Sequence, residues 1–359
     1  MRSRNHGVTL IRLAAALMVL SGHMSYIMGL TPIFVFGQAV QGLGVKIFFL
    51  LGGVFITKSW LSDPNPLRYV VKRFFRIWPP LAIYVILATF VFGPFLTRFS
   101  VSEYYFSPSI LAYLDNLRFY IGYVLPGVFE TNPYPNAVNG SLWTLPVEVF
   151  MYMVIPFTVF ALLKGVKSKI TRMIVSALLC VAVCSIQMVF SFFPGARLVI
   201  YATDWVSALA VIPFYFIGMF YALFESDIEK RLNLPIAILL MIVFSCFDFQ
   251  GIVYTAFFYL VFSYLVLSLA FGTHINFHGG WTQNLEISYG IYLWGFFIQQ
   301  TIEHIIIKLG ISLTFTMELL LCTILSAGFA WLSMKFVEEP AQKLCKKVLI
   351  RIPNKKELR

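Results

Sequence analysis

Apolar runs of about 20 residues recur along almost the whole chain and constrain its fold more than any other feature. The sequence is 59% hydrophobic and only 12% charged over 359 residues, a balance that no water-soluble domain shows. Because the bilayer core offers no hydrogen-bond partners, backbone N–H and C=O groups must pair within the protein, and such runs therefore predict spanning helices. We expect an all-α polytopic membrane protein with about ten transmembrane helices. The expected spans are 7–29, 43–60, 81–95, 145–163, 174–193, 205–224, 234–249, 252–271, 287–307 and 311–336.

The distribution of Lys and Arg predicts the orientation of these spans. Basic clusters occupy 58–76, 164–172, 230–231 and the segment after 335, each on the same side of the membrane if the spans alternate. An excess of basic residues is typical of cytoplasmic loops, so we expect both termini in the cytoplasm. The basic residues then left outside the cytoplasmic face are Lys46, Arg98, Arg118, Arg197 and Lys308.

The organisation that follows is a single membrane domain with a short tail. The first apolar run is too long for a signal peptide and has no small-residue cleavage site, so it is expected to remain as the first span. We expect residues 1–340 to form the membrane domain and 341–359 a basic cytoplasmic tail. The net charge of +11 is explained by the loops, and no nucleic-acid partner is expected.

Two ionisable residues, Arg12 and His23, lie inside the first span. They are eleven residues apart, which is within roughly 20° of three full turns, so both side chains leave the same helix face. Ionisable groups inside a membrane usually face the protein interior and carry function. The alternatives are an arginine that snorkels to the headgroups and a histidine with a structural role. We interpret the face as a site that has a cation near one surface and a base deeper in.

A second candidate residue, Glu148, lies in the segment NGSLWTLPVEVFMY at 139–152. The predicted topology brings this segment into the membrane from outside and puts Glu148 at a depth similar to that of His23. A buried carboxylate without a partner is costly, so we expect a His23–Glu148 pair that orients a general base. The alternative is an acid that hydrogen-bonds to a neighbouring helix.

A cluster of cations precedes the third span. Arg73 and Arg76 are three residues apart and Lys72 is four residues before Arg76, so the three can gather on one side of a helix. Such a cluster suits a phosphate-bearing ligand. The alternative is ordinary positive-inside charge.

No metal site is expected. The five cysteines lack metal-ligand spacing and are expected to be small core residues. His274 and His278 are four residues apart, but no third ligand is near them in the sequence, and a solvated loop is the favoured interpretation.

Several blocks of the chain, in order, resemble the acyltransferase-3 family of integral membrane acyltransferases over nearly the whole length. The blocks are Arg12 with His23, GVKIFFLLGGVFI, KRFFRIWP, NGSLWTLPVEVFMY, SYGIYLWGF and FVEEPAQ. The sequence departs from the family at two positions, where Thr9 and Lys46 replace aspartates that the family often has. The soluble hydrolase-like domain that some members append is not seen, so the membrane domain is expected to complete transfer alone or with a partner.

The resemblance implies transfer of an acyl group, most simply acetyl, from cytoplasmic acetyl-CoA to a sugar hydroxyl of a cell-envelope or exported glycan such as O-antigen, capsule or exopolysaccharide. Acetyl-CoA would be a co-substrate, and no metal is implied. The implied setting is the bacterial inner membrane, with membrane lipid and a free or lipid-linked glycan as partners. The implied catalytic residues are His23, Glu148 and Arg12; the implied donor-binding residues are Arg73, Arg76 and Lys72; the expected acceptor-binding residues are Trp143, Asn139, Ser141 and Tyr152.

A secondary transporter remains the alternative from another class of protein, because intramembrane Arg, His and Glu can also form a substrate or proton path. A transporter predicts movement of substrate without an acyl donor, whereas the enzyme predicts donor-dependent modification.

Overall fold

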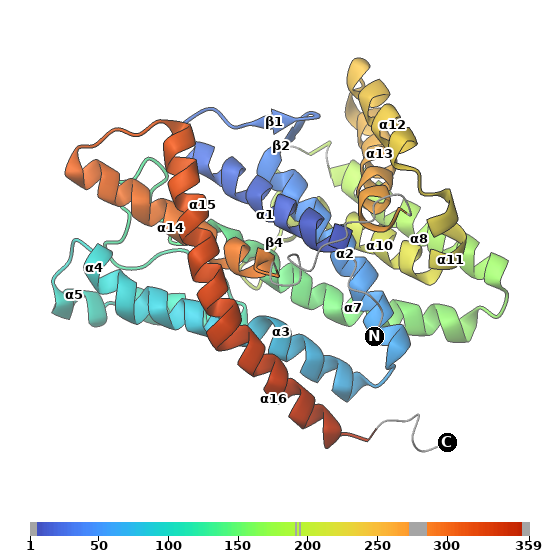
Figure 1. Cartoon of the computed structure of the whole chain (residues 1–359), viewed down its shortest axis with the longest axis horizontal. Helices are drawn as coiled ribbons and strands as arrows, with labels where there is room; N and C mark the ends of the chain where they lie inside the picture. Colours follow the sequence, from blue (N-terminus) through green and yellow to red (C-terminus); the bar gives the residue numbers. More distant parts are fainter. Residues whose placement is uncertain (1–5, 191, 194, 273–285, 354–359) are drawn as a thin grey trace.

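The computed structural model describes residues 6–190, 192–193, 195–272 and 286–353 and consists almost entirely of helices (Figure 1). Eight helical segments in these ranges are long and apolar enough to cross a membrane. The prediction of an all-α polytopic membrane protein is therefore confirmed. The assignment of both termini to the cytoplasm stays a prediction.

The bounds of the elements are as follows. The first half of the chain contains α1 (His6–Ile27), β1 (Phe34–Val35), β2 (Gln38–Ala39), α2 (Val40–Ser62), α3 (Pro66–Leu87), the π-helix η1 (Ala88–Phe92), α4 (Gly93–Leu96), α5 (Val101–Tyr105), α6 (Pro108–Leu114), the 3₁₀ helices η2 (Asp115–Arg118) and η3 (Gly140–Trp143), and α7 (Thr144–Gly165). The second half contains α8 (Lys169–Phe190), β3 (Val199–Ile200), β4 (Thr203–Asp204), α9 (Trp205–Leu209), α10 (Ile212–Leu223), α11 (Glu225–Ile228), the 3₁₀ helix η4 (Glu229–Arg231), α12 (Leu234–Cys246), α13 (Gly251–Phe271), α14 (Ser288–Leu309), α15 (Phe315–Ser333), the π-helix η6 (Met334–Glu338) and α16 (Glu339–Ile350). The strands form two short antiparallel hairpins, β1–β2 and β3–β4.

Two of the ten predicted spans are helices that fall outside the group of eight. The first, α12, has only 13 residues, fewer than the hydrocarbon core requires of a straight helix. The second, α14, is 22 residues long but polar, because it carries Gln299, Gln300 and Glu303. These three side chains are buried inside the protein, so α14 need not be apolar to lie within the bundle.

Close backbone contacts through glycine position α2 between α1 and α10. A Cβ atom added to Gly44 of α2 would collide with the carbonyl oxygen of Ala15 in α1, and one added to Gly53 would collide with the carbonyl oxygen of Tyr215 in α10. Membrane helices pack in this way because small residues let two backbones approach closely. Gly22 of α1 lies against Gln41, so α1 and α2 run antiparallel.

Local sequence signals account for the start of α3. The side chain of Asn65 caps the helix by accepting hydrogen bonds from the backbone N–H groups of Leu67 and Arg68, and Pro66 occupies the first helical position. The helix continues through η1 and α4, so one helical segment extends over Pro66–Leu96. This segment carries Arg73 and Arg76.

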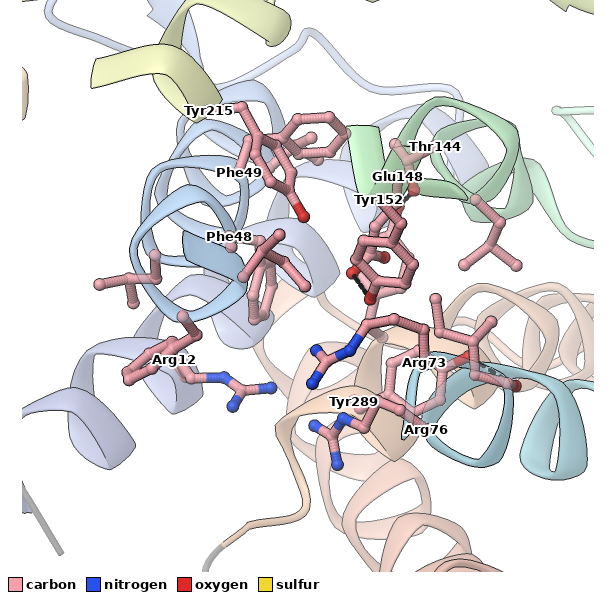
Figure 2. A pocket seen from close by; sticks show the side chains of 18 of the residues that line it. Arg12, Phe48, Phe49, Arg73, Arg76, Thr144, Glu148, Tyr152, Tyr215 and Tyr289 are labelled. Atoms are coloured by element: carbon pink, nitrogen blue, oxygen red, sulfur yellow. Dashed lines mark hydrogen bonds between the residues drawn. The ribbon is translucent and has the colours of Figure 1, made fainter. Parts of the chain in front are cut away.

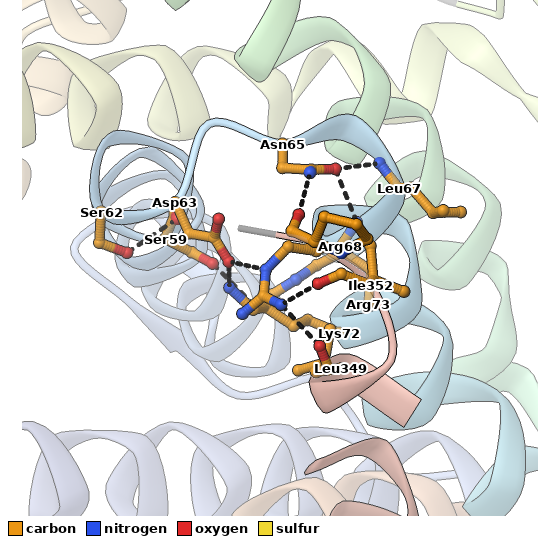
Figure 3. Close-up of polar contacts among 11 residues, drawn as sticks. Ser59, Ser62, Asp63, Asn65, Leu67, Arg68, Lys72, Arg73, Leu349 and Ile352 are labelled. Atoms are coloured by element: carbon orange, nitrogen blue, oxygen red, sulfur yellow. Dashed lines mark hydrogen bonds and ion pairs between the residues drawn. The ribbon is translucent and has the colours of Figure 1, made fainter. Parts of the chain in front are cut away.

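Residues 349–353, the last that the structure describes, dock against the beginning of α3 (Figure 3). The guanidinium of Arg68 donates hydrogen bonds to the carbonyl oxygens of Leu349 (2.6 Å) and Ile352 (2.9 Å), and Asn65 donates one to that of Pro353 (3.3 Å). The predicted domain boundary at residue 340 falls inside α16, which follows η6 without a break. The part of the tail that the structure describes is thus packed on α3.

Candidate active site

A cavity of about 270 Å³ lies among α1, α2, α3, α7, α10 and α14 (Figure 2). Its apolar wall comes mainly from α2. Its polar lining residues are Arg12, Arg73, Arg76, Thr144, Glu148, Tyr152, Tyr215, Glu286, Tyr289 and Tyr292. The cavity therefore brings together four residues singled out by the sequence, namely Arg12, Arg73, Arg76 and Glu148, together with Tyr152.

Three guanidinium groups converge in the lower part of this view, one from α1 and two from α3 (Figure 2). Arg73 lies between two tyrosine rings, with its guanidinium carbon 5.6 Å from the ring centres of both Tyr69 and Tyr152. Its Nη2 donates to Ser59 (3.3 Å), whereas its buried Nε has no partner in the part of the chain that the structure describes. Such stacking fixes the plane of a guanidinium and leaves N–H donors for an anionic ligand.

Arg76 contacts Tyr289 of α14 and Glu338 of η6. Its guanidinium carbon lies 5.6 Å above the ring of Tyr289, and Nη1 is 3.6 Å from a carboxylate oxygen of Glu338. Glu338 is the last residue of η6, and π-helical segments are frequent at functional sites. Glu338 belongs to the block FVEEPAQ, but the sequence indicated no role for it. Its partner could not be identified from spacing.

Two further lining residues were also missed. Tyr215 lies outside every block that carried the resemblance, and Glu286 lies just before α14. An acid at the edge of an apolar segment was the only available signal for Glu286. A tyrosine in an apolar helix gives no signal at all.

Glu148 occupies a different position from the one predicted. Its carboxylate accepts a hydrogen bond of 2.6 Å from the hydroxyl of Tyr152, one turn along α7, and it lines the same cavity as Arg12. The start of α7 explains this position, because Thr144 hydrogen-bonds to Tyr292 (2.6 Å) in the second turn of α14. Glu148, one turn after Thr144, is therefore not level with His23, whose ring packs on Phe296.

His23 does not line the cavity. Its half-buried ring packs edge-to-face on Phe296 of α14, with 5.1 Å between the ring centres. Among the described residues it forms no hydrogen bond with Glu148, so the expected His23–Glu148 pair is not formed in this structure. Phe296 is one helical turn beyond Tyr292, a lining residue, so His23 lies about one turn past the end of the cavity.

Lys72 forms an ion pair with Asp63, at the beginning of α3 (Figure 3). Its ammonium is 2.6 Å from Oδ2 of Asp63, which also accepts a 2.8 Å hydrogen bond from Arg68. Partial burial acts to raise the pKa of Asp63, but the hydrogen bonds from Lys72 and Arg68 outweigh it and lower that pKa. Of the three cations expected to act together, only Arg73 and Arg76 line the cavity.

The other residues expected to bind the acceptor lie outside the cavity. Asn139 is buried and donates to the carbonyl oxygen of Leu293 (2.8 Å). As the N-cap of η3, it also accepts a hydrogen bond from the N–H of Ser141 (2.9 Å). Ser141 is also buried, and Trp143 is partly buried against the hydrophobic core. These contacts join η3 to α14 and form part of the scaffold of the site.

Lys46, one of the two departures from the family pattern, is buried in α2. Its ammonium donates to the side-chain oxygen of Gln38 (2.9 Å) and lies 6.0 Å from the centre of the Phe258 ring. Lys46 does not line the cavity, although Val45 beside it does.

No three metal-binding side chains gather within the described ranges. His274 and His278 lie outside the described residues.

Comparisons with known proteins agree with one another. The family model described as "Acyltransferase domain" (acyltransferase-3) matches residues 5–335. The chain is similar to an "O-acetyl transferase" of Shigella phage Sf6, with 28% identity over 81% of this chain and 84% of the relative. It is also similar to "Nodulation protein 10" of Rhizobium leguminosarum bv. viciae, with 32% identity over 41% of this chain and 42% of the relative. No solved structure matches.

Proposed function

Because the chain belongs to the acyltransferase-3 family, we propose that it transfers an acetyl group from cytoplasmic acetyl-CoA to a hydroxyl of a cell-envelope or exported glycan. The observation that carries the proposal is the cavity in which Arg12, Arg73 and Arg76 converge. His23 lies one helical turn past the end of the cavity that is marked by Tyr292. The printed name of the phage relative supports acetyl as the group transferred. The protein would act as a multi-pass protein of the bacterial inner membrane.

The arginines are suited to the phosphate groups of the donor. Guanidinium groups bind phosphate through paired N–H donors, and the stacking of Arg73 on Tyr69 and Tyr152 leaves its buried Nε available in the described part of the chain. Arg76 has a carboxylate partner in Glu338 at 3.6 Å, a separation long enough for a ligand oxygen to compete. With the phosphates at these arginines, the thioester would extend toward His23.

His23 would be the general base. Its imidazole would remove the proton from the acceptor hydroxyl while the hydroxyl oxygen attacks the thioester carbonyl carbon. The new C–O bond forms, the C–S bond breaks, and the imidazolium returns the proton to the CoA thiolate. A route through an acetyl-histidine intermediate would use the same side chain as a nucleophile.

Glu148 takes a different role in this proposal from the one that the sequence predicted. Its carboxylate hydrogen-bonds to Tyr152 inside the cavity and so would contact the donor, whereas orientation of His23 falls to its packing on Phe296.

The experiment that tests the function is transfer of radiolabelled acetyl from acetyl-CoA to an envelope-glycan fraction by the purified protein in lipid nanodiscs. We expect His23→Ala to reduce transfer by a factor of about 10² to 10⁴. The matched control is His304→Ala, because His304 is also in a membrane helix but does not line the cavity. Equal activity of the His23→Ala protein and the wild type would contradict the assignment of the base.

Donor binding has its own pair of variants. Arg73→Gln should raise the KM for acetyl-CoA about tenfold or more, since it removes a charged hydrogen-bond donor. Lys72→Gln, one residue away but paired with Asp63, should leave the KM close to that of the wild type. If the wild type moves glycan across the membrane without any donor and modifies none of it, the transporter alternative replaces the enzyme.

A further inference from the structure

The hydroxyl of Tyr215, like Nε of Arg73, is a buried polar group of a cavity-lining residue whose hydrogen bonding is incomplete among the described residues. It is buried and has no hydrogen-bond partner in the described part of the chain. The three other tyrosines on the wall are bonded: Tyr152 donates to Glu148 (2.6 Å), Tyr289 to the carbonyl oxygen of Ile77 (3.3 Å) and Tyr292 to that of Ser141 (2.8 Å). Buried polar groups are rarely left unpaired in folded proteins, so a ligand in the cavity is the natural partner of the Tyr215 hydroxyl.

The position of this hydroxyl is fixed by the packing of α10 on α2. The ring of Tyr215 lies across Gly52, where an added Cβ atom would be 2.9 Å from the hydroxyl oxygen. Phe49 packs edge-on against the same ring, with 5.5 Å between ring centres and an interplanar angle of 88°. Figure 2 shows the hydroxyl directed into the space between Phe48 and Tyr152. The group is a preorganised donor.

The same packing shows how far this donor lies from His23. Gly44 of α2 contacts Ala15 of α1, which is eight residues before His23. Because α1 and α2 are antiparallel, Gly52 lies eight residues farther along α2, roughly 12 Å farther from His23. Arg73 donates a hydrogen bond to Ser59, which is seven residues farther still along α2. The hydroxyl of Tyr215 therefore faces the part of the cavity between Arg73 and the end nearest His23.

We propose that Tyr215 binds the pantetheine arm of the acyl donor by donating a hydrogen bond from its hydroxyl to an amide carbonyl oxygen of that arm. The proposal rests on the proposed function, in which the phosphates are at the arginines and the thioester is near His23. The segment of acyl-CoA between these ends is the pantetheine arm, and its amide carbonyls are the acceptors it offers. Tyr215 is thus a donor-binding residue outside the blocks that define the resemblance.

The test compares Tyr215→Phe with Tyr221→Phe in the full-length protein in nanodiscs. Tyr221 is a matched control because it is on the same helix, is equally buried and also has a hydroxyl without a partner among the described residues, yet it does not line the cavity. The measurement is the Kd of acetyl-CoA and of free CoA by calorimetry. We expect Tyr215→Phe to weaken both ligands about three- to tenfold and Tyr221→Phe to weaken neither.

Free CoA is the decisive ligand because it has the pantetheine amides but no acyl carbonyl. A loss for acetyl-CoA alone would assign the hydroxyl to the thioester and overturn the proposal, as would unchanged binding of both ligands. An equal loss in the Tyr221→Phe protein would show general loosening of α10 and would also overturn it.

A second variant tests the same contact from the α2 side. Gly52→Ala should displace the ring of Tyr215 and reproduce the loss of binding, and the double variant with Tyr215→Phe should lose little more. Losses that add fully would contradict action through the hydroxyl. If the wild type transfers acetyl normally while Tyr215→Phe binds normally, the inference fails and the proposed function stands; a wild type that neither binds nor uses CoA removes both.

Discussion

A carboxylate oxygen of Glu338 lies 3.6 Å from Nη1 of Arg76, so the last residue of η6 partners a cation of the cavity. Glu338 is much the less exposed of the two, at 8% of its side-chain surface against 29% for Arg76. The pair therefore lies at the boundary between the protein core and the cavity. It joins the C-terminal part of the chain to the third membrane helix at the candidate site.

Glu338→Ala should destabilise the protein by about 3 kcal/mol, because it leaves a largely buried guanidinium without its carboxylate. Glu339→Ala is the neighbouring control: the ion pair of Glu339 with Lys335 at 3.4 Å is solvent-exposed and should contribute less than about 1 kcal/mol. Chemical unfolding in mixed micelles measures both. Equal stabilities of the two variants would contradict a structural role for the Arg76–Glu338 pair.

Asn139→Ala should lower stability by about 1–3 kcal/mol, because it removes the partners of the Leu293 carbonyl and the Ser141 N–H in a buried position. Ser141→Ala is the control within the same block, because the Ser141 hydroxyl has no partner among the described residues. Thermal unfolding, together with the KM for the glycan, distinguishes a structural role of Asn139 from a role in binding the acceptor. A raised KM at unchanged stability in the Asn139→Ala protein would restore the prediction that Asn139 binds the acceptor.

Gly218→Ala should destabilise the contact between α10 and α2 by about 1–3 kcal/mol, because the added methyl group would collide with the backbone carbonyl of Leu50. Gly328→Ala in α15 meets no atom within 4 Å and should be neutral or slightly stabilising. Unfolding of the two variants in parallel checks the prediction. A Gly218→Ala protein as stable as the Gly328→Ala protein would mean that the two helices are not in backbone contact.

The ion pairs of Asp63 with Arg68 and Lys72 should make the stability of the folded protein depend on pH in the acid range. The pKa of Asp63 in the folded protein is below its ordinary value of 3.8, so its contribution to stability is complete above pH 3.8 and is lost as the pH falls through the lower, folded value. Asp63→Asn should therefore lower the Tm at neutral pH, and the difference from the wild type should shrink in acid. Asp227→Asn, which removes an exposed ion pair with Lys169, should change the Tm little at any pH. A difference for Asp63→Asn that stays constant down to full acid unfolding would exclude this linkage.

The membrane helices could be predicted because bilayer thickness fixes the length of an apolar run. The prediction was least accurate at α12, which is short, and at α14, which carries polar side chains buried inside the protein, since such helices do not follow that rule. Charge inside or beside apolar runs singled out Arg12, Arg73 and Arg76 one by one, and the cavity brings the three together.

The relative heights of side chains on different helices could not be predicted. The sequence indicates where α7 is apolar but not that its first residue, Thr144, is bonded to Tyr292 near the start of α14, and this contact sets the depth of Glu148. Likewise, Lys72 and Arg73 are adjacent in the sequence and point about 100° apart on a helix, but the sequence does not indicate that Lys72 pairs with Asp63 while Arg73 lines the cavity. Such relationships depend on tertiary contacts, which leave no periodic signal.

The π-helix η6 makes this part of the chain tolerant of a change in the number of its residues. A π-helical turn holds an extra residue, so everything after it is rotated by about 100° relative to an uninterrupted α-helix of the same length. Deleting one residue between 334 and 337 would remove that extra residue and give a regular α-helix, with α15 and α16 each kept on its packing surface. A one-residue deletion is thus expected to be less harmful here than elsewhere in the same long helix, and length variation among natural variants should concentrate at these positions.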